Sequence, residues 1–436
     1  MKTLKNILNK LVNLSLLLCK AMKYYWFFRS SHNMTSEELE RYQFDSVKRT
    51  LIYASKKVPY YRDLFRTINF DPERDFKKLE DIKKIPYTDK ETLRNNYQRF
   101  LSEDIEKLHV EYAYTSGSTG TPLKIALDIN SRAAKYAMVY KLRKYGGYTL
   151  WKKAFSLWGI YATTKKTPYG IDKVKNILYY ANNKMTTDNN IEVGKLLLDF
   201  KPIQYEGYAR SFLELGKTLV KENIERWSPS SIFCYGDCLT DAMRDELTNI
   251  YQTKVYDFYS HVENVVVIGE FTPSERYVME DFFYPEIKSI KETIGGGELV
   301  GTSFYNFAMP LIRYRTGDII EIENENLDNQ ISFLKIKSIK GREHDYIVLS
   351  DGRKILSIQR AIYGYDGIIA SQVIQTSYTD LCINMIVDEK FNHNGLSTIA
   401  TKVDDVCGTK MHVTFNIVNQ LEKSQSGKAP FIIRRL

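Results

Sequence analysis

A loop rich in hydroxyl residues and glycine lies between two apolar segments near residue 115. The sequence of residues 113–127 is AYTSGSTGTPLKIAL. Glycines at positions 117 and 120 allow a close backbone approach and a positive φ, so backbone N–H groups can point at an anion. The loop is not a Walker A motif, because no Gly-Lys-Ser/Thr follows at the required spacing. By composition alone it fits a phosphate cradle and an exposed turn equally well.

Four segments further along the chain carry other residue types that a nucleotide site needs. They are FYSHVE at 258–263, YRTGD at 314–318, GREHDYI at 341–347 and SQSGK at 424–428. Together with YTSGSTGTPLK at 114–124, they resemble the ordered motifs of the adenylate-forming superfamily, which includes acyl-CoA synthetases and peptide-synthetase adenylation domains. Five such motifs in the right order favour the phosphate cradle.

A closer resemblance is to the phenylacetate–coenzyme A ligase family, and especially to its branch associated with capsular polysaccharide biosynthesis. The segments ASKKVPYYRDLF, YEGYARSFLELG and GELVGTSFYNFAMPLIRYRTGD are typical of that branch. The resemblance covers nearly the whole chain after the first thirty residues. It implies an α/β fold, with a large N-terminal adenylate-forming domain of mixed sheets and helices and a small mobile α+β C-terminal domain.

The resemblance also implies a role for each matched residue. The β- and γ-phosphates of ATP would be held by Thr115, Ser116, Gly117, Ser118, Thr119, Gly120 and Thr121. Adenine and ribose would be bound by Gly236, Asp237, Tyr259, Asp318 and Arg342. Glu263 would ligate Mg²⁺, a hard cation that prefers carboxylate and phosphate oxygens. Lys428 would stabilise the charge that develops on the α-phosphate in the transition state.

Structural explanations stay open for several of these residues. Glu263 could cap a helix, Lys428 could be a solvated lysine, and Tyr259 could belong to the core. The acid pocket is less well defined, because core packing explains aromatic residues equally well. The residues in segments that could line this pocket are Trp158, Tyr205, Gly207 and Tyr208.

Three positions depart from the usual pattern of the family. Ser260 stands where a glycine is usual, Val262 replaces the usual threonine, and Lys124 comes one residue late. These changes affect the fine placement of adenine and phosphate. They remove none of the charged groups that the chemistry requires.

The implied function is ATP-dependent adenylation of a small carboxylic acid, followed by acyl transfer to coenzyme A. One alternative is an adenylate-forming enzyme that passes an acyl or aminoacyl group to a sugar or carrier in capsule biosynthesis. Alternatives of other classes are a catalytically silent, nucleotide-binding scaffold of a polysaccharide assembly complex and a membrane-surface adaptor. The sequence does not identify the acid.

The elements that must position these motifs follow an α/β pattern. Residues 36–66 and 128–146 have helical periodicity, and residues 109–115 alternate like a strand that leads into the hydroxyl-rich loop. Short apolar runs such as KAFSLWG, PIQYEGY and SSIFCYG each precede a helical pattern. We therefore predict a basic amphipathic segment at 1–30, an adenylation domain at 31–339 and a C-terminal lid domain at 340–436.

Composition limits the possible compartments and sites. The 436 residues are 43% apolar and 26% charged, as in an ordinary globular protein. The five cysteines are odd in number and scattered, which favours a reducing, cytoplasmic location over a disulfide framework. Cys234 and Cys238 have no second ligand pair at zinc spacing, and HExxH and GxSxG motifs are absent.

The first thirty residues carry much of the net charge of +9. They hold six lysine and arginine residues and no acidic one. On a helical wheel Leu4, Ile7, Leu8, Leu11, Leu14 and Leu18 share one face, opposite Lys2, Asn6, Asn9, Asn13 and Lys20. Such a helix could rest on the inner face of an anionic membrane or dock on the body of the protein. Its charge pattern does not favour nucleic-acid binding.

Overall fold

The computed structural model of the chain describes most of its residues. The described residues are 2–114, 123–157, 167–236, 239, 241–289, 296–323, 331–340, 346–355, 358–362, 365, 367–387, 389, 391–419, 421–422 and 431–436. The chain forms two compact units. The first contains residues 1–113, 124–148 and 256–342, and the second contains residues 114–123, 149–255 and 343–436. The predicted domain boundary near residue 340 remains a prediction.

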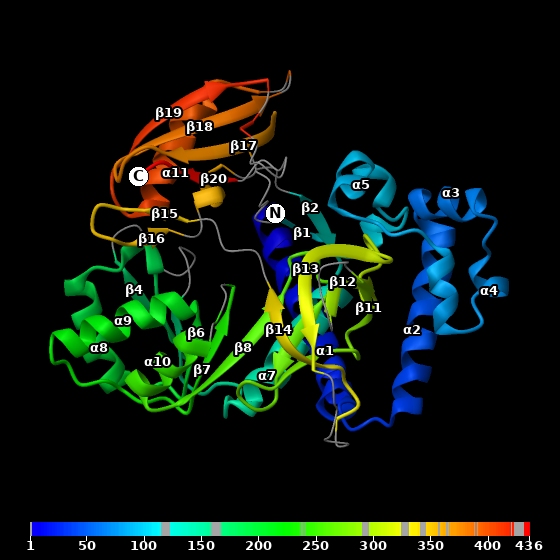
Figure 1. The fold of residues 1–436 in the computed structure, drawn as a ribbon, viewed down its shortest axis with the longest axis horizontal. Coiled ribbons are helices and arrows are strands. Elements are labelled where there is room, and N and C mark those ends of the chain that lie inside the picture. The colour runs from blue at the N-terminus through cyan, green and yellow to red at the C-terminus, as the bar shows by residue number, and fades with distance from the viewer. Residues whose placement is uncertain are drawn as a thin grey trace. The chain divides into compact units, whose positions relative to one another are not determined.

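The first unit begins with a series of helices, most of which are labelled in Figure 1. They are α1 (Lys2–Ser31), α2 (Ser36–Lys57), α3 (Pro59–Thr67), α4 (Pro72–Asp75), α5 (Lys90–Asn95), α6 (Tyr97–Phe100) and the later α7 (Ile129–Tyr145), with 3₁₀ turns at Leu79–Lys84 and Ile105–Lys107. A capping box at Thr35 and Glu38 starts α2. The helix predicted over 36–66 is divided at Pro59, because proline has no N–H and fits the first turn of a new helix.

The sheet of the first unit is antiparallel throughout. Its strands are β8 (Lys254–Ser260), β9 (Val267–Glu270), β10 (Arg276–Val278), β11 (Phe283–Ser289), β12 (Gly296–Ser303), β13 (Tyr314–Ile322) and β14 (Lys335–Lys340). They are arranged in the order β11-β12-β13-β14-β10-β9-β8. Two further strands, β1 (Glu111–Tyr114) and β2 (Lys124–Leu127), pair with each other on either side of the predicted phosphate loop. The predicted strand before the loop is confirmed.

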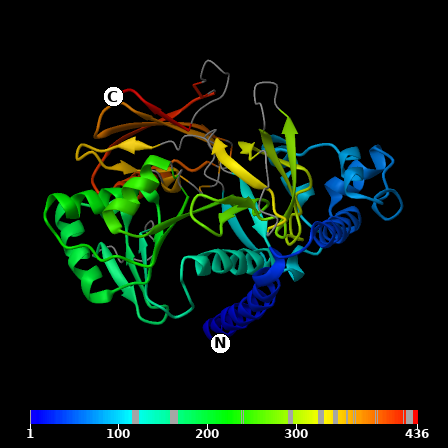
Figure 2. The ribbon, with the colours of Figure 1, turned by 60° about the horizontal axis from the view of Figure 1, so that its bottom comes forward.

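Helix α7 connects the N-terminal helices to this sheet. Asp128 caps it, accepting a hydrogen bond from the Ser131 N–H at 2.8 Å, as its position before the helix predicts. The second carboxylate oxygen of Asp128 accepts from the Phe307 N–H at 2.7 Å, which ties the helix to the segment after β12. Helix α1 packs along α7, and Figure 2 shows the two helices side by side.

The second unit contains a mostly parallel sheet with helices between its strands. Its elements are β3 (Ala154–Leu157), β4 (Tyr169–Asp172), β5 (Ile177–Tyr180), α8 (Thr187–Phe200), β6 (Gln204–Gly207), α9 (Ala209–Lys221), β7 (Ser231–Tyr235) and α10 (Asp241–Tyr251), with a 3₁₀ turn at Asn182–Lys184. The strand order is β7-β6-β3-β5-β4, and only β4 is antiparallel to its neighbour. The three short apolar runs predicted as strands are β3, β6 and β7, and they are confirmed.

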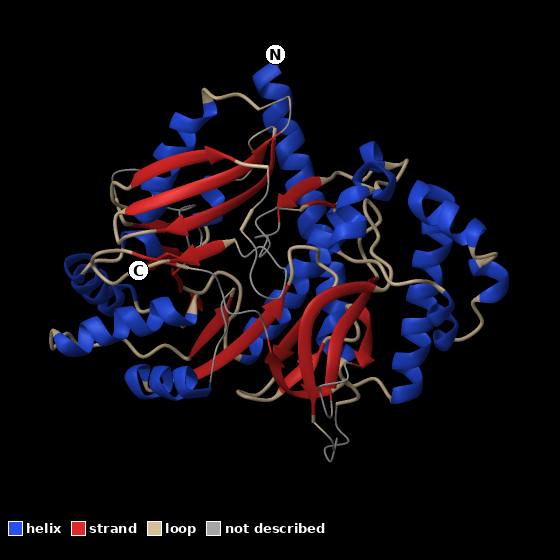
Figure 3. Cartoon of the chain, turned by 45° about the horizontal axis from the view of Figure 1, so that its top comes forward, coloured by secondary structure: helices blue, strands red, loops and turns tan. Residues whose placement is uncertain are grey.

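The C-terminal part of the second unit is a small α+β layer, drawn in Figure 3. It contains β15 (Ile347–Val348), β16 (Lys354–Ile355), β17 (Ile368–Gln375), β18 (Asp380–Val387), α11 (Gly395–Cys407), β19 (His412–Ile417) and β20 (Ile432–Arg434), with a 3₁₀ turn at Ile358–Ala361. Four of the strands form a sheet in the order β19-β18-β17-β20. Buried residues such as Ile383 on β18 and Val403 on α11 share one apolar core.

The carboxyl group of Glu280, in the first unit, should make the free energy of unfolding depend on pH. Burial raises the pKa of Glu280 to about 7, although hydrogen bonds from the Leu334 N–H (2.7 Å) and the Gln43 side chain (3.4 Å) oppose the shift. The folded protein therefore binds more protons at this group than the unfolded chain does. The free energy of unfolding should then fall as pH rises from about 4.5 to about 7.

Over this pH range, we expect the free energy of unfolding of Glu280→Gln to decrease by about 1–3 kcal/mol less than that of the wild type. The measurement is chemical denaturation of wild type and variant between pH 5 and pH 8. If plots of the free energy of unfolding against pH are parallel for the two proteins, the pKa of Glu280 is not raised.

Candidate nucleotide-binding site

The end of β8 and the turn that follows it carry three of the motif residues. Tyr259 is the second-to-last residue of the strand, and His261 and Glu263 lie in the turn. Asn264, which has a φ of 57°, closes the turn by donating its N–H to the His261 carbonyl at 3.2 Å. Its side-chain amide donates to the carbonyl (2.9 Å) and hydroxyl (2.6 Å) of Ser131 on α7. The first turn of α7 therefore fixes the motif turn.

The YRTGD segment forms an irregularity at the start of β13. The register between β12 and β13 shifts between Glu298 and Val300, whose partners are Ile319 and Arg315. Residues 316–318 therefore lie in a bulge, a feature that redirects side chains beside functional sites. Gly317 adopts a φ of 78°, which favours glycine.

Glu298 holds the bulge from the neighbouring strand. Its carboxylate accepts the Gly317 N–H at 3.1 Å and pairs with the Arg315 guanidinium at 2.8 Å. The Thr316 hydroxyl donates to the Leu299 carbonyl at 2.7 Å and accepts the Asp318 N–H at 3.1 Å. These contacts give Arg315, Thr316 and Gly317 structural roles in holding the bulge.

Asp318 is the acceptor of a small polar cluster. Its Oδ2 accepts the Tyr259 hydroxyl at 2.6 Å and lies 2.9 Å from Nε2 of His261. The Tyr259 hydroxyl and His261 Nε2 are also within hydrogen-bonding distance of each other. His261 can be the second donor to this carboxylate in any form that carries a hydrogen on Nε2. Two motifs more than fifty residues apart thus meet at one oxygen.

Glu263 is linked to the same segment by a separate contact. The Tyr314 hydroxyl donates to its Oε1 at 3.1 Å, and Glu263 is buried. Among the described residues, no group of three or more His, Cys, Asp or Glu side chains could hold a metal ion. Mg²⁺ is commonly bound by one or two carboxylates together with substrate phosphates, so a single glutamate is compatible with it. Glu263 therefore fits a magnesium ligand that acts together with a nucleotide.

Several predicted site residues lie outside the described part of the chain. They are Thr115, Ser116, Gly117, Ser118, Thr119, Gly120, Thr121, Trp158, Asp237, Arg342 and Lys428. Gly236 is described and follows β7 with a φ of 84°. Its predicted contact with adenine is not tested by this geometry.

The predicted pocket residues on β6 have structural explanations. Tyr205 is fully buried among the rings of Phe155, Phe212 and Tyr251, and its hydroxyl donates to the Trp227 carbonyl at 3.2 Å. Gly207 has a φ of 148°, and a Cβ there would lie 2.1 Å from the Leu157 carbonyl oxygen. Tyr208 is buried at the start of α9. Their role in acid binding remains a prediction.

The roles of His261 and Glu298 were not predicted from the sequence. His261 lies two residues after Tyr259, and this spacing places side chains on the same face of an extended chain. That spacing was the available signal for His261. Nothing local marked Glu298, because its contacts cross from β12 to β13.

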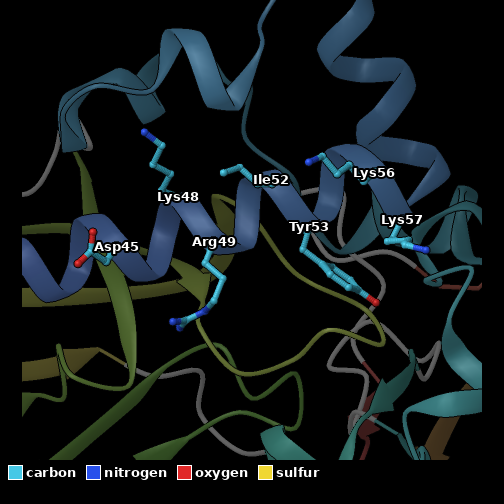
Figure 4. A pocket seen from close by; sticks show the side chains of 7 residues that line it. All are labelled: Asp45, Lys48, Arg49, Ile52, Tyr53, Lys56 and Lys57. Carbon is cyan, nitrogen blue, oxygen red and sulfur yellow. The ribbon is translucent and has the colours of Figure 1, made fainter.

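A surface hollow elsewhere in the first unit is separate from this site. One face of α2, from Asp45 to Lys57, lines it, as Figure 4 shows. Two of its cations are already paired, Lys56 with Glu73 at 2.6 Å and Lys57 with Asp104 at 3.0 Å. None of the predicted site residues lines this hollow.

Comparison with known proteins relates the chain to CapK and to phenylacetate–coenzyme A ligases. The CapK C-terminal domain family matches residues 347–435. Protein CapK of Staphylococcus aureus is 24% identical over 394 residues, covering 88% of this chain and 86% of CapK. The phenylacetate–coenzyme A ligase of Thermus thermophilus is also 24% identical, over 444 residues that cover 90% of this chain and 95% of the ligase.

These similarities support an adenylate-forming, phenylacetate–coenzyme A ligase-like family with a CapK branch. The fold agrees with that of a crystal structure of 2-hydroxyisobutyryl-CoA ligase in complex with 2-HIB-AMP and CoA. The TM-score is 0.62 at 18% identity, and the match covers 93% of this chain and 92% of that one. The predicted α/β fold class, with the large N-terminal and small C-terminal domains of adenylate-forming ligases, is thereby confirmed.

Proposed function

We propose that this protein is an ATP-dependent ligase that activates a small carboxylic acid and transfers the acyl group to coenzyme A. In the first step a carboxylate oxygen attacks the α-phosphorus of ATP, and the bond to the bridging oxygen breaks to release pyrophosphate. In the second step the thiol of coenzyme A attacks the acyl carbon and AMP leaves. Similarity to phenylacetate–coenzyme A ligases supports both steps.

The observation that carries the proposal is the meeting of two distant motifs. The Tyr259 hydroxyl donates to Asp318 at 2.6 Å, and the Tyr314 hydroxyl donates to Glu263 at 3.1 Å. The two carboxylates that we propose to bind ribose and Mg²⁺ each accept a hydrogen bond from a tyrosine of the other segment. Asp318 would accept hydrogen bonds from the ribose hydroxyls, sharing or replacing those from Tyr259 and His261.

The remaining roles follow the motifs of the family. Glu263 would hold Mg²⁺, which would neutralise phosphate charge, and the loop from Thr115 to Thr121 would hold the departing pyrophosphate. Lys428, in the C-terminal domain, would stabilise charge on the α-phosphate. For the second step, we propose that this domain rotates and rebuilds the site around the thiol.

The proposal is tested by trapping the adenylate. The full-length protein is incubated with ATP, Mg²⁺ and single acids, including phenylacetate, and pyrophosphate release and hydroxamate formation with hydroxylamine are measured. We expect one class of acid to give both products and, with coenzyme A, a thioester. Nucleotide binding without pyrophosphate release for any acid would instead favour the inactive scaffold.

The similarity to CapK favours a second candidate for the acceptor of the acyl group. The family match at 347–435 covers the C-terminal domain, which carries Lys428. In this variant of the proposal an acyl or aminoacyl adenylate forms in the same way but is transferred to a sugar or carrier in capsule biosynthesis. An adenylate that is trapped by hydroxylamine but never yields a coenzyme A thioester would favour it.

The nucleotide assignment predicts the effect of Asp318→Asn. The amide keeps the shape of the side chain but loses the charge and one acceptor. Because hydrogen bonds to charged groups contribute about 1.5–3 kcal/mol, we expect the KM for ATP to rise roughly 10–100-fold, with a smaller change in kcat. Asp188→Asn, an exposed residue on α8, is the matched control. An unchanged KM for ATP would remove Asp318 from the nucleotide site.

The proposal places the enzyme in the cytoplasm, where ATP and coenzyme A are available. The odd number and the scatter of the five cysteines favour a reducing compartment. A contact between residues 1–30 and a membrane would depend on a different surface, the exposed face of α1.

A further inference from the structure

Helix α1 docks on the body of the protein through its polar and aromatic face. The Lys20 ammonium donates to the Asn130 side chain at 2.8 Å, and the Tyr24 hydroxyl approaches the same oxygen at 3.4 Å. Phe28 is fully buried against the rings of Tyr305 and Phe282. These docking residues are spaced by four, so they share one face of the helix.

The opposite face of α1 is apolar and exposed. It carries Val12, Leu14, Leu18, Met22 and Trp26, and each of these side chains is between 50% and 60% exposed. From Leu14 onward they recur every four residues and form one stripe along the helix. Leu14 and Leu18 belong to the leucine face that the helical wheel identified, and docking leaves these two side chains exposed.

The charges beside this stripe are all positive among the side chains that the structure describes. Lys23 and Arg29 are exposed, and the Arg29 guanidinium lies 5.2 Å from the centroid of the Trp26 ring. The first acidic residue of the sequence is Glu37, beyond the end of the helix. An apolar stripe flanked only by cations is complementary to an anionic lipid surface.

We propose that α1 is an interfacial helix that binds the protein to an anionic membrane through the stripe formed by Val12, Leu14, Leu18, Met22 and Trp26. Within the described residues, no helix is long and apolar enough to cross a membrane, so the proposed contact lies in the plane of the interface. A second copy of the chain is a poorer occupant, because pairing would bring two positively charged faces together without an acidic partner.

The end of α1 is anchored firmly enough to transmit this contact to the protein body. Ser31 is buried and its hydroxyl donates to the Asp281 carboxylate, which also pairs with Lys141 on α7 at 3.2 Å. Tyr25 lies 4.9 Å from the Tyr140 ring and accepts a hydrogen bond from Lys144 at 3.0 Å. A membrane-bound α1 would therefore hold α7 and the first unit close to the surface.

Co-sedimentation of the full chain with vesicles tests the proposal. Vesicles of phosphatidylcholine with about one third phosphatidylglycerol are compared with vesicles of phosphatidylcholine alone. We expect binding to the anionic vesicles that weakens as salt is added, since exposed charges are screened. The double variant Leu18→Gln/Met22→Gln should bind roughly 10–100-fold more weakly, because about half of each side chain is available for burial.

Two further variants separate the apolar contribution from the charge. Lys23→Gln/Arg29→Gln should weaken binding to anionic vesicles about 10–30-fold, since each cation near such a surface contributes about 1 kcal/mol. The control Ile171→Gln/Val174→Gln removes two exposed apolar side chains from the second unit and should leave binding unchanged. Unfolding curves that match wild type would show that the variants are folded.

Three results would overturn the proposal. The first is the absence of vesicle binding by the wild type. The second is binding to neutral and anionic vesicles with equal affinity. The third is a concentration-dependent dimer, detected by light scattering without lipid, that Leu18→Gln/Met22→Gln abolishes, since the stripe would then belong to a second copy. None of these readouts depends on adenylation, so the proposed enzyme activity is tested separately.

Discussion

Lys428→Ala is expected to slow adenylation about 10²–10³-fold, or about 2.7–4 kcal/mol, by analogy with the loss of one oxyanion donor. The physical reason is that this cation would act on charge that develops at the α-phosphate only in the transition state. An interaction of that kind changes the rate of the chemical step more than it changes substrate binding. ATP affinity should therefore be nearly unchanged. Single-turnover release of pyrophosphate measures the step directly.

Lys410→Ala is the matched control for this prediction. Lys410 is exposed in the same C-terminal region, and its replacement removes the same charge. We expect it to leave adenylation at the level of the wild type. If Lys428→Ala also adenylates at that level, Lys428 takes no part in the first step.

Lys141→Met is expected to lower the free energy of unfolding by about 3–5 kcal/mol. The Lys141 ammonium lies 3.2 Å from the Asp281 carboxylate, and both side chains are almost completely buried. Burial lowers the pKa of Lys141, and the adjacent Asp281 opposes that shift. Removal of the cation would leave a buried carboxylate without its counter-charge, which costs more than a lost surface pair.

A double-mutant cycle tests whether this cost comes from the pair. Asp281→Asn should also destabilise the protein, whereas Lys141→Met/Asp281→Asn should be less destabilised than the sum of the two single variants. Lys144→Met on the same helix is the control, because Lys144 is exposed and should contribute less than about 1 kcal/mol. Chemical denaturation followed by tryptophan fluorescence gives all four values. Strict additivity would show that the two residues do not interact.

Most secondary-structure elements of this chain are predictable from local sequence. The helix α7 starts where Asp128 supplies its cap, and the strands β3, β6 and β7 coincide with the apolar runs KAFSLWG, PIQYEGY and SSIFCYG. These features depend on neighbouring residues and on apolar periodicity, both of which are visible in the sequence. The division at Pro59 is local as well, because the restriction acts within one helical turn.

The candidate site was predictable only in part. Tyr259, Glu263 and Asp318 were identified as candidates from the motifs. The contacts that hold them, however, involve residues from other elements. Asn264 fixes the first turn through Ser131 on α7, and Glu298 fixes the bulge from β12. A motif shows which side chains are present. Their hydrogen-bond partners depend on which strands lie next to each other in the folded chain.

The resemblance to a family, the order of the motifs and the amphipathic character of residues 1–30 can be read from the sequence. The contacts of Tyr259 and His261 with one oxygen of Asp318, and the docking of α1 through Lys20, Tyr24 and Phe28, become visible only in the folded chain. A helical wheel predicts two faces but not which of them the rest of the chain covers. That choice depends on Asn130, Phe282 and Tyr305, which lie more than a hundred residues away, so no local pattern contains it.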